Sequence, residues 1–255
     1  MMSTNPVKAL RIEHTTVLQP ASFQRVLTPP FASKGELTGM CGRIAYSIPN
    51  DVFLSSYPWV RQVVNPAPRY NIAPTDPVLA VGPDRAEVVR WGIDGAGSGL
   101  FNLRSETATQ RPYYQRMLLQ SRVLIPASHF YEWRSNGASR LPVAVFRGDG
   151  RPLNLAGVIA AWKGRPAVTV LTTIPNDDIA GLHNRMPVVL NDDDAATWVL
   201  EDMSLDQVAG FLKPCPNGWL RLAAASPLVN DVRNQGSDLL DPAALPPEFQ
   251  LELIP

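Results

Sequence analysis

Short runs of apolar, β-branched residues alternate with turn-forming residues along most of the chain after Cys41. Gly, Pro or Asn-Asp clusters bound most of these runs, which is typical of strands. The pattern predicts strands at 78–82, 86–92, 122–127, 141–147, 153–162, 167–173 and 219–226. The Gly-Asp-Gly sequence at 148–150 lies between two of these runs and predicts a hairpin turn.

Helical patterns are fewer and lie between or after the strands. Asn50 and Asp51 are placed to cap the first helix. Helices are predicted from Asn50 to about Val60, from Ser105 with an interruption near Pro112, after Asn176, after Asn191 and over 204–212. Strands do not alternate with helices as they do in a parallel sheet. We therefore predict a single α+β domain built on an antiparallel, barrel-like sheet with flanking short helices.

The first 39 residues differ from the rest, because their apolar residues are scattered and follow no sustained period. We predict a non-native or removable, disordered extension over 1–39, a domain over 40–242 and a tail over 243–255. The extension lacks the basic start and apolar middle of a secretory signal. No apolar run approaches the ~20 residues that span a bilayer. These features predict a cytoplasmic protein without a membrane partner.

Composition narrows the candidate functions. The chain has 23 basic and 23 acidic residues, so bulk positive charge does not drive nucleic-acid binding, and any such contact depends on individual arginines. The two cysteines, Cys41 and Cys215, form no disulfide framework, which favours a reducing compartment. The three histidines have no metal-ligand spacing with either cysteine, so we expect no metal.

Several polar residues admit both an ordinary structural reading and a chemical one. Cys41 fits a buried small hydrophobe. Glu132 is flanked by aromatic residues in "HFYEW"; it is either an outward-facing strand residue or a desolvated carboxyl with a raised pKa, suited to proton transfer. His183 fits a helix C-terminal cap. Asn102 and Arg104 fit loop residues that cap the following helix.

Taken together, a thiol, a carboxylate, an imidazole, a carboxamide and several guanidiniums make up the inventory of a nucleophile, an acid/base pair, an orienting group and an anion clamp. The arginines concerned, each of which also fits an ordinary surface charge, are Arg43, Arg104, Arg111 and Arg185.

Nine motifs in one order resemble the SRAP family of SOS response-associated peptidases, the abasic-site processing proteins. They are "MCGR", "RYNIAPTD", "RWG", "NLRSET", "VLIPASHFYEW", "LAGVIAAW", "LTTIPND", "LHNRMPVVL" and "VNDVRNQG". The resemblance runs from Met40 to about Pro242 and implies the SRAP fold. It also implies a sensor of abasic sites in single-stranded DNA that links to them covalently through the cysteine of MCGR.

Carried over by motif, the resemblance implies a catalytic set and phosphate contacts at Arg43 and Arg104; beyond this we expect a wider DNA-binding set, no cofactor and a monomeric protein. The catalytic set is Cys41, Asn102, Glu132 and His183. The DNA-binding set is Arg43, Arg104, Arg111, Trp91, Trp133 and Arg185. Arginines of this kind hold phosphates and fix register without reading sequence.

The chemistry explains why a cysteine must come first in the working chain. An N-terminal Cys41 carries an α-amine and a thiol on adjacent carbons, which can close a five-membered thiazolidine on the aldehyde of an abasic sugar. Inside a chain its nitrogen is an unreactive amide. We therefore expect either translation from Met40 with loss of the methionine, which we favour, or self-cleavage between Met40 and Cys41 by peptidase chemistry.

The sequence departs from the usual pattern of the family at two places. The family often carries a Pro and a Trp in a wedge loop after "WG", but here the loop is "WGIDGAGSGLFN", so junction preference is in question. His129 stands where Gly is common and is either a polar contact near Glu132 or a plain strand residue.

Two alternative functions stay open. They are a thiol peptidase acting on other proteins, with Cys41 and His183, and a non-catalytic module that binds single-stranded DNA.

Overall fold

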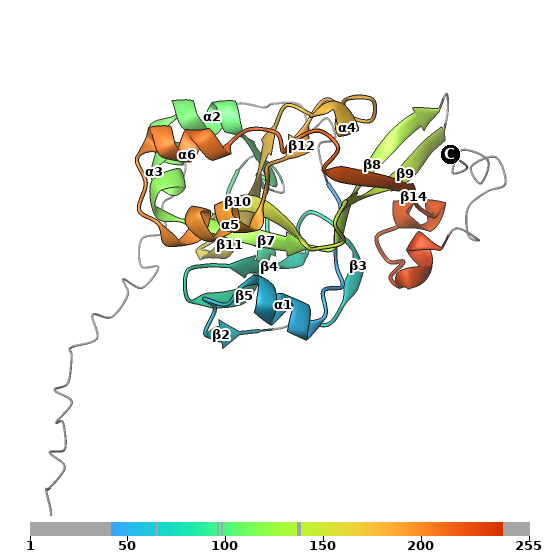
Figure 1. The fold of residues 1–255 in the computed structure, drawn as a ribbon, viewed down its shortest axis with the longest axis horizontal. Helices are drawn as coiled ribbons and strands as arrows, with labels where there is room; N and C mark the ends of the chain where they lie inside the picture. The colour runs from blue at the N-terminus through green and yellow to red at the C-terminus, as the bar shows by residue number, and fades with distance from the viewer. Residues whose placement is uncertain (1–41, 65, 96, 98, 137–138, 242–255) are drawn as a thin grey trace, which may run out of the picture.

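The computed structural model describes residues 42–64, 66–95, 97, 99–136 and 139–241. The predicted extension over 1–39, the predicted tail over 243–255 and the candidate nucleophile Cys41 all lie outside the described residues. The helices and strands labelled in Figure 1 lie within this described part of the chain.

Strands make up most of the described structure, and short helices lie between them (Figure 1). The strands are β1 (Ile44–Tyr46), β2 (Gln62–Val63), β3 (Arg69–Ile72), β4 (Pro77–Val81), β5 (Arg85–Trp91), β6 (Asn102–Arg104), β7 (Arg122–Ala127), β8 (His129–Asn136), β9 (Ser139–Arg147), β10 (Leu153–Trp162), β11 (Arg165–Thr173), β12 (Met186–Pro187), β13 (Val189–Leu190) and β14 (Leu220–Ala224). The helices are α1 (Asn50–Ser56), α2 (Ser105–Gln110), α3 (Pro112–Gln120), α4 (Asp177–Ala180), α5 (Asp192–Leu200) and α6 (Leu205–Phe211), with 3-10 turns η1 (Pro227–Asn230) and η2 (Ser237–Leu240).

The larger sheet closes on itself. Antiparallel pairings join β11, β10, β7, β4 and β5 in that order, and a parallel pairing of β5 with β11 completes the ring. This ring confirms the barrel-like α+β fold. The sheet is not purely antiparallel, since β6 also runs parallel to β11 and β2 runs parallel to β5.

A second sheet has the order β14-β9-β8-β1-β3 and lies at the right of Figure 1. One continuous stretch of chain joins the two sheets, because β7 ends at Ala127 and β8 begins at His129 with only Ser128 between them. This arrangement carries the "HFYEW" motif from the barrel into the second sheet.

Most predicted strands are confirmed, but the hairpin predicted at 148–150 is wrong. Arg147 ends β9 in the second sheet and Leu153 begins β10 in the barrel, so this turn connects two sheets. β9 pairs instead with β8 and β14. The predicted cap of the first helix is also wrong, because Pro49 occupies the N-cap and no side chain bonds there. Asn191 does cap α5 and accepts from the N–H of Asp194.

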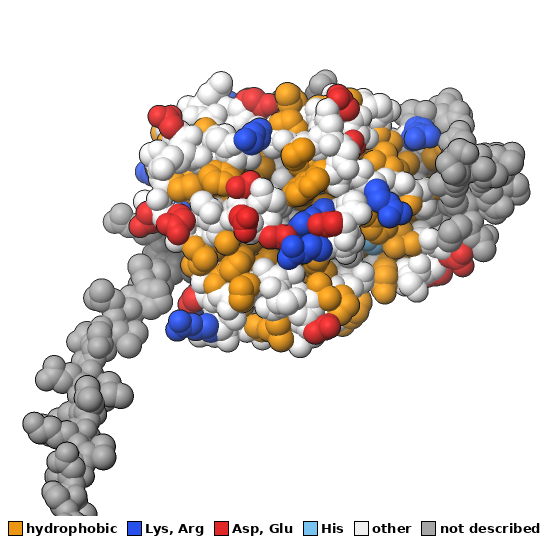
Figure 2. All heavy atoms as spheres, viewed as in Figure 1, with side chains coloured by type: hydrophobic (Ala, Val, Ile, Leu, Met, Phe, Trp, Pro, Cys, Tyr) orange, Lys and Arg blue, Asp and Glu red, His pale blue; other side chains and the backbone are white. Residues whose placement is uncertain are grey.

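The main core lies within the barrel and between the barrel and its neighbouring elements, and its largest fully buried side chains include Trp91, Trp198, Phe53 and Phe130. A smaller cluster around Tyr131 fills the space beneath the second sheet. Figure 2 shows acidic and basic side chains interspersed among apolar ones over one face of the molecule. This mixture fits the zero formal net charge, so contacts with an anion on this face would depend on individual side chains.

Candidate functional site

Glu132 lies on β8 and is buried, with 3% of its surface exposed. The outward-facing reading of this residue is therefore wrong. Its neighbours Phe130 and Tyr131 are fully buried, so the strand is covered on both faces. A carboxyl group withdrawn from water in this way is a candidate for proton transfer.

Arg43 lies at the start of β1, next to the strand that carries Glu132. The main-chain N–H of Tyr131 donates to the carbonyl of Arg43 at 2.9 Å, and Ile44 pairs with Phe130 in the antiparallel register. The Arg43 guanidinium carbon lies 5.5 Å from the centre of the Trp133 ring. Burial lowers the pKa of Arg43 from its ordinary value, while the charges of Asp76, Tyr131 and Asp231 oppose this change.

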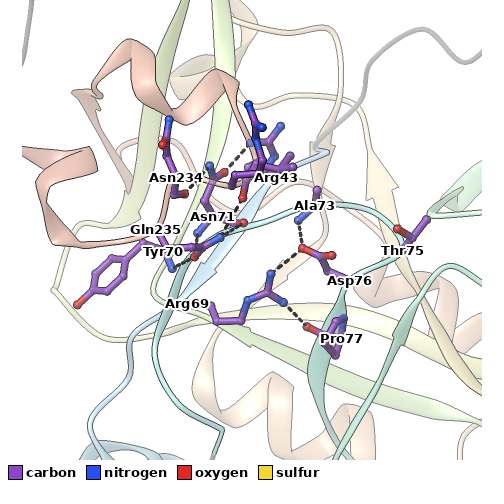
Figure 3. A network of polar contacts seen from close by, with 12 residues as sticks. Arg43, Arg69, Tyr70, Asn71, Ala73, Thr75, Asp76, Pro77, Asn234 and Gln235 are labelled. Carbon is purple, nitrogen blue, oxygen red and sulfur yellow. Dashed lines mark hydrogen bonds and ion pairs between the residues drawn. The ribbon is translucent and has the colours of Figure 1, made fainter.

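Asn71, on β3, holds Arg43 (Figure 3). Nη1 of Arg43 donates to Oδ1 of Asn71 at 2.5 Å and to the carbonyl of Val229 at 2.6 Å. Nδ2 of Asn71 donates to the carbonyls of Val229, Asp231 and Asn234 at 3.2, 2.9 and 3.0 Å. Asn71 is completely buried, and its amide connects β3 to Arg43 and to the segment from Val229 to Asn234.

Trp133 is half-buried beside this network. Its Nε1 donates to Oδ1 of Asn230 at 2.7 Å, which fixes the ring against η1. The indole therefore has one edge tied to the C-terminal segment and a cationic group over its face. Its partial exposure is compatible with the predicted DNA contact, which stays a prediction.

Asn102 and Arg104 lie on β6, not in a loop. β6 pairs with β11, with Asn102 opposite Val170 and Arg104 opposite Thr172. No side chain bonds at the N-cap of α2, so the expected capping role is not seen. Arg104 is exposed, as a phosphate contact requires, while Asn102 is half-buried.

His183 follows α4 and is anchored by a single ring nitrogen. Its Nδ1 lies 3.1 Å from the main-chain N of Arg185 and 3.2 Å from the carbonyl of the same residue. A neutral ring can accept from this N–H, and a charged ring can donate to this carbonyl. Either way Nε2 remains the nitrogen directed away from the anchor.

Arg185 is engaged by neighbours on two elements. Its Nη1 and Nη2 donate to the two carboxylate oxygens of Glu106 at 2.8 and 2.9 Å, and Nη2 also donates to the carbonyl of Thr172 at 2.7 Å. Hydrogen bonding from Arg185 holds the pKa of Glu106 below its ordinary value. Asn102, Arg104, His183 and Arg185 are thus gathered around the C-terminal half of β11.

Two members of the predicted DNA-binding set, Trp91 and Arg111, lie outside the group of residues around the C-terminal half of β11. Trp91 is completely buried in the barrel, where its Nε1 donates to the carbonyl of Phe101 at 2.9 Å. This burial contradicts the predicted contact of Trp91 with DNA, because a ring enclosed by the core cannot reach a base. Arg111 is exposed between α2 and α3, roughly 10 Å along α2 from Arg104 at 1.5 Å per helical residue.

Two other sequence features have structural roles. His129 packs edge-on against Tyr131 at 4.8 Å and beside Phe146 at 4.9 Å, and it is buried. Burial lowers its pKa to about 3, which matches a plain strand residue. Cys215 is buried as well, and burial raises the pKa of its thiol to about 12.

Within the described part of the chain, His, Cys, Asp and Glu side chains form no group of three or more that could hold a metal ion. None of the helices described above is long and apolar enough to cross a bilayer.

The residues missed by sequence reasoning are Asn71, Glu106 and Gln235. Each stands inside a motif quoted above, "RYNIAPTD", "NLRSET" or "VNDVRNQG". The signal was the presence of polar residues in these motifs. The roles of Asn71 and Gln235 depend on the contact between the first and last of these motifs beside Arg43, and the role of Glu106 depends on its ion pair with Arg185.

Comparison with known proteins identifies the family. The profile of the SOS response associated peptidase (SRAP) family matches residues 40–232. The chain is 32% identical over 192 residues to the abasic site processing protein YoaM of Bacillus subtilis, covering 68% of this chain and 85% of that protein. It is 27% identical over 222 residues to the abasic site processing protein YedK of Escherichia coli, covering 80% of this chain and all of that protein.

Solved structures share the fold. A crystal structure of a protein from Bordetella bronchiseptica superposes with a TM-score of 0.62 at 24% identity, covering 73% of this chain and all of that one. A protein from Bacteroides thetaiotaomicron superposes with a TM-score of 0.60 at 18% identity, covering 68% and 84% of the two chains. With the family profile spanning most of the chain, this protein belongs to the SRAP family.

Proposed function

We propose that this protein captures abasic sites in single-stranded DNA by forming a covalent bond through Cys41 as its first residue. Family membership and the similarity to abasic site processing proteins support handling of abasic sites. The finer proposal, a thiazolidine at an N-terminal cysteine, rests on the chemistry of the site.

The observation that carries the proposal is the pairing of β1 with β8. The main-chain N–H of Tyr131 donates to the carbonyl of Arg43, so the chain just before β1 runs beside the part of β8 that carries Glu132. Cys41 lies outside the described residues, but it is bonded to Gly42, and consecutive Cα atoms are only ~3.8 Å apart. The proposal is that a terminal amine at Cys41 reacts beside this buried carboxyl group.

The reaction balances without any oxidant or reductant. The neutral α-amine attacks the aldehyde carbon of the open sugar, and loss of one water gives an imine. The thiol then adds to the same carbon, a C–S bond forms, and the nitrogen gains the proton that the sulfur loses. An α-amine of pKa ~7.7–8.0 is partly neutral at pH 7, whereas a lysine amine of pKa ~10.4 is not.

Each remaining group has a proposed role. Glu132 carries the proton between the amine and the departing water. His183, anchored through Nδ1, donates from Nε2 to the ring oxygen as the sugar opens. Asn102 holds the amine or the sugar without titrating, and the exposed Arg104 holds a phosphate.

We further propose that residues 1–40 are absent from the working form. Translation from Met40 followed by loss of the methionine is the simpler route. Self-cleavage before Cys41 is the second, and it would use the same thiol, carboxyl and imidazole, which agrees with the peptidase in the family description. A peptidase acting on other proteins remains the alternative function, since it needs no free α-amine.

Intact-mass measurement tests the proposal directly. A chain beginning at Cys41 is mixed with a single-stranded oligonucleotide carrying one abasic site. We expect a product whose mass is the sum of protein and oligonucleotide minus one water. A Cys41→Ala chain should form no such product.

The decisive comparison is a chain with one glycine added before Cys41, which keeps the thiol but converts the amine to an amide. We expect this chain to lose the adduct. An equal yield of adduct from the extended chain would overturn the proposal. Peptide hydrolysis that survives the added glycine, without adduct from the parent chain, would favour the peptidase.

A further inference from the structure

We infer that the C-terminal segment 229–235 and Asn71, together called the clasp, position the N-terminal nucleophile, and that Arg43 acts through this clasp as a positioning residue. The inference rests on the proposed function of Cys41 and adds positioning residues to it. Its basis is that Arg43, near the start of the region that matches the family, and Asp231, near its end, both bond to the buried amide of Asn71.

The hydrogen bonds of the clasp leave Asn71 little freedom. Its Oδ1 accepts from Arg43, and its Nδ2 faces three main-chain carbonyls of the clasp. A completely buried carboxamide with this many partners is fixed in one orientation, because each lost bond would leave a desolvated polar group. The guanidinium that it holds is therefore fixed as well.

Gln235 completes the clasp from the other side (Figure 3). Its Oε1 accepts from the main-chain N–H groups of Tyr70 and Asn71 at 3.1 and 3.2 Å, and its Nε2 donates to the carbonyl of Asn71 at 2.8 Å. This side chain satisfies an edge of β3 in the way a neighbouring strand would. The segment 229–235 is thus bound to β3 by both main-chain and side-chain groups.

The clasp also contacts the strand that carries Glu132. Asn230 accepts from Nε1 of Trp133, the residue next to Glu132, while the carbonyl of Val229 accepts from Arg43. One short segment therefore fixes residues on both β1 and β8. These contacts hold the chain just before β1 against the part of β8 that carries Glu132.

This geometry reassigns Arg43. The Nη1 group serves Asn71 and Val229, and the guanidinium is partly buried above Trp133. Both bonds come from Nη1 of a planar guanidinium that lies over the Trp133 ring, whereas a lysine ammonium supplies the same charge without this plane. Replacing Arg43 by lysine therefore separates positioning from attraction of phosphate.

The experiment uses the chain beginning at Cys41 and the variants Arg43→Lys and Gln235→Ala. The first measurement is the rate of adduct formation at saturating abasic oligonucleotide. The second is the Kd for an oligonucleotide with a tetrahydrofuran site, which cannot form an imine. We expect the rate to fall about tenfold or more, since small displacements of reacting groups are costly, and the Kd to stay within about threefold because the charge is kept.

Val232→Ala is the matched control, because Val232 lies in the same segment with its side chain 43% exposed. It should leave both quantities unchanged, and thermal unfolding should show all variants folded. A raised Kd with an unchanged rate at saturation for Arg43→Lys would overturn the inference and restore the phosphate role. An equal loss of rate in Val232→Ala would overturn it too, by showing general loosening.

The same data distinguish this inference from the proposed function. A parent chain that forms no adduct contradicts the proposed function and the clasp with it. A parent chain that forms the adduct, with Arg43→Lys and Gln235→Ala reacting at the parent rate, contradicts only the clasp.

Discussion

Arg185 and Glu106 form a two-pronged ion pair, with both guanidinium Nη atoms bonded to separate carboxylate oxygens at 2.8 and 2.9 Å. The side chain of Arg185 is 11% exposed and that of Glu106 is 50% exposed. Because the main chain of Arg185 also anchors Nδ1 of His183, the carboxylate at the start of α2 steadies the segment that presents the imidazole.

Replacing Glu106 by glutamine should slow adduct formation by about tenfold, because the loosened Arg185 no longer fixes His183 for proton transfer. The rate at saturating abasic oligonucleotide is the quantity to measure. Asp206→Asn is the control, since Asp206 is an exposed acidic residue in the first turn of α6 and undergoes the same change of charge. Equal rates for the two variants would contradict the role given to Glu106.

His129 should make folding stability depend on pH between neutrality and pH 5. Its folded pKa is about 3 because of burial, whereas an unfolded histidine titrates near ~6.5. Between these values the unfolded chain binds a proton that the folded chain excludes. This contribution to stability is fully present above ~6.5 and is lost as pH falls toward the folded pKa.

The variant His129→Leu should flatten this dependence by about 1.4 kcal/mol per pH unit, the value of one excluded proton. Urea unfolding at several values between pH 7 and 5 measures it, in a range above the titration of ordinary carboxyl groups. Parallel stability curves for the parent and the variant would show that His129 takes up its proton in the folded state.

Asp192 should be important for stability because it pairs with a buried arginine that links the two sheets. Nη1 and Nη2 of Arg147 donate to the two carboxylate oxygens of Asp192 at 2.8 and 3.0 Å, and Arg147 is 5% exposed. We expect Asp192→Asn to lower the free energy of unfolding by about 2–3 kcal/mol, since it removes charge from the partner of a desolvated cation.

Asp193→Asn is the control for this variant, because Asp193 is exposed in the same first turn of α5 and should change stability by only ~0.5 kcal/mol. Chemical denaturation of the two variants side by side separates the ion pair from the helix dipole. Losses of similar size would show that the pair with Arg147 is not the source.

Thr75 should tolerate glycine with a gain in stability. It has a φ of 82°, in the left-handed region that β-branched residues avoid. Its N–H donates to the carbonyl of Trp91 at 2.9 Å, which holds the loop between β3 and β4 in place. Relief of strain worth ~1–3 kcal/mol outweighs the entropy that glycine loses, so we expect Thr75→Gly to gain about 1 kcal/mol in unfolding experiments.

The sequence predicts the long apolar strands well, since burial on both faces leaves an unmistakable run of β-branched residues. It does not predict β1, β3, β6 or β8. These strands are short or carry buried polar residues such as Asn71, His129 and Glu132, and their pairing depends on distant partners. The hairpin predicted at 148–150 is wrong because the composition of a turn does not indicate whether the two strands that it connects lie in the same sheet.

The motifs predict which residues belong to the candidate site, but they do not predict which side chains surround each of these residues. Trp91 shows the limit, since "RWG" carries no sign of the barrel that encloses the ring. Glu106 and Asn71 show the converse, because their partners Arg185 and Arg43 lie 79 and 28 positions away in the chain. Only the folded arrangement reveals which polar residue holds which.

The bond between Arg43 and the carbonyl of Val229 spans 186 positions. During synthesis the amino-terminal side of this bond leaves the ribosome early, and its acceptor follows only when most of the chain has been made. The network around Asn71 therefore cannot close on a nascent chain that still lacks Val229. Completion of this part of the fold is thereby deferred until translation of the region that matches the family is nearly finished.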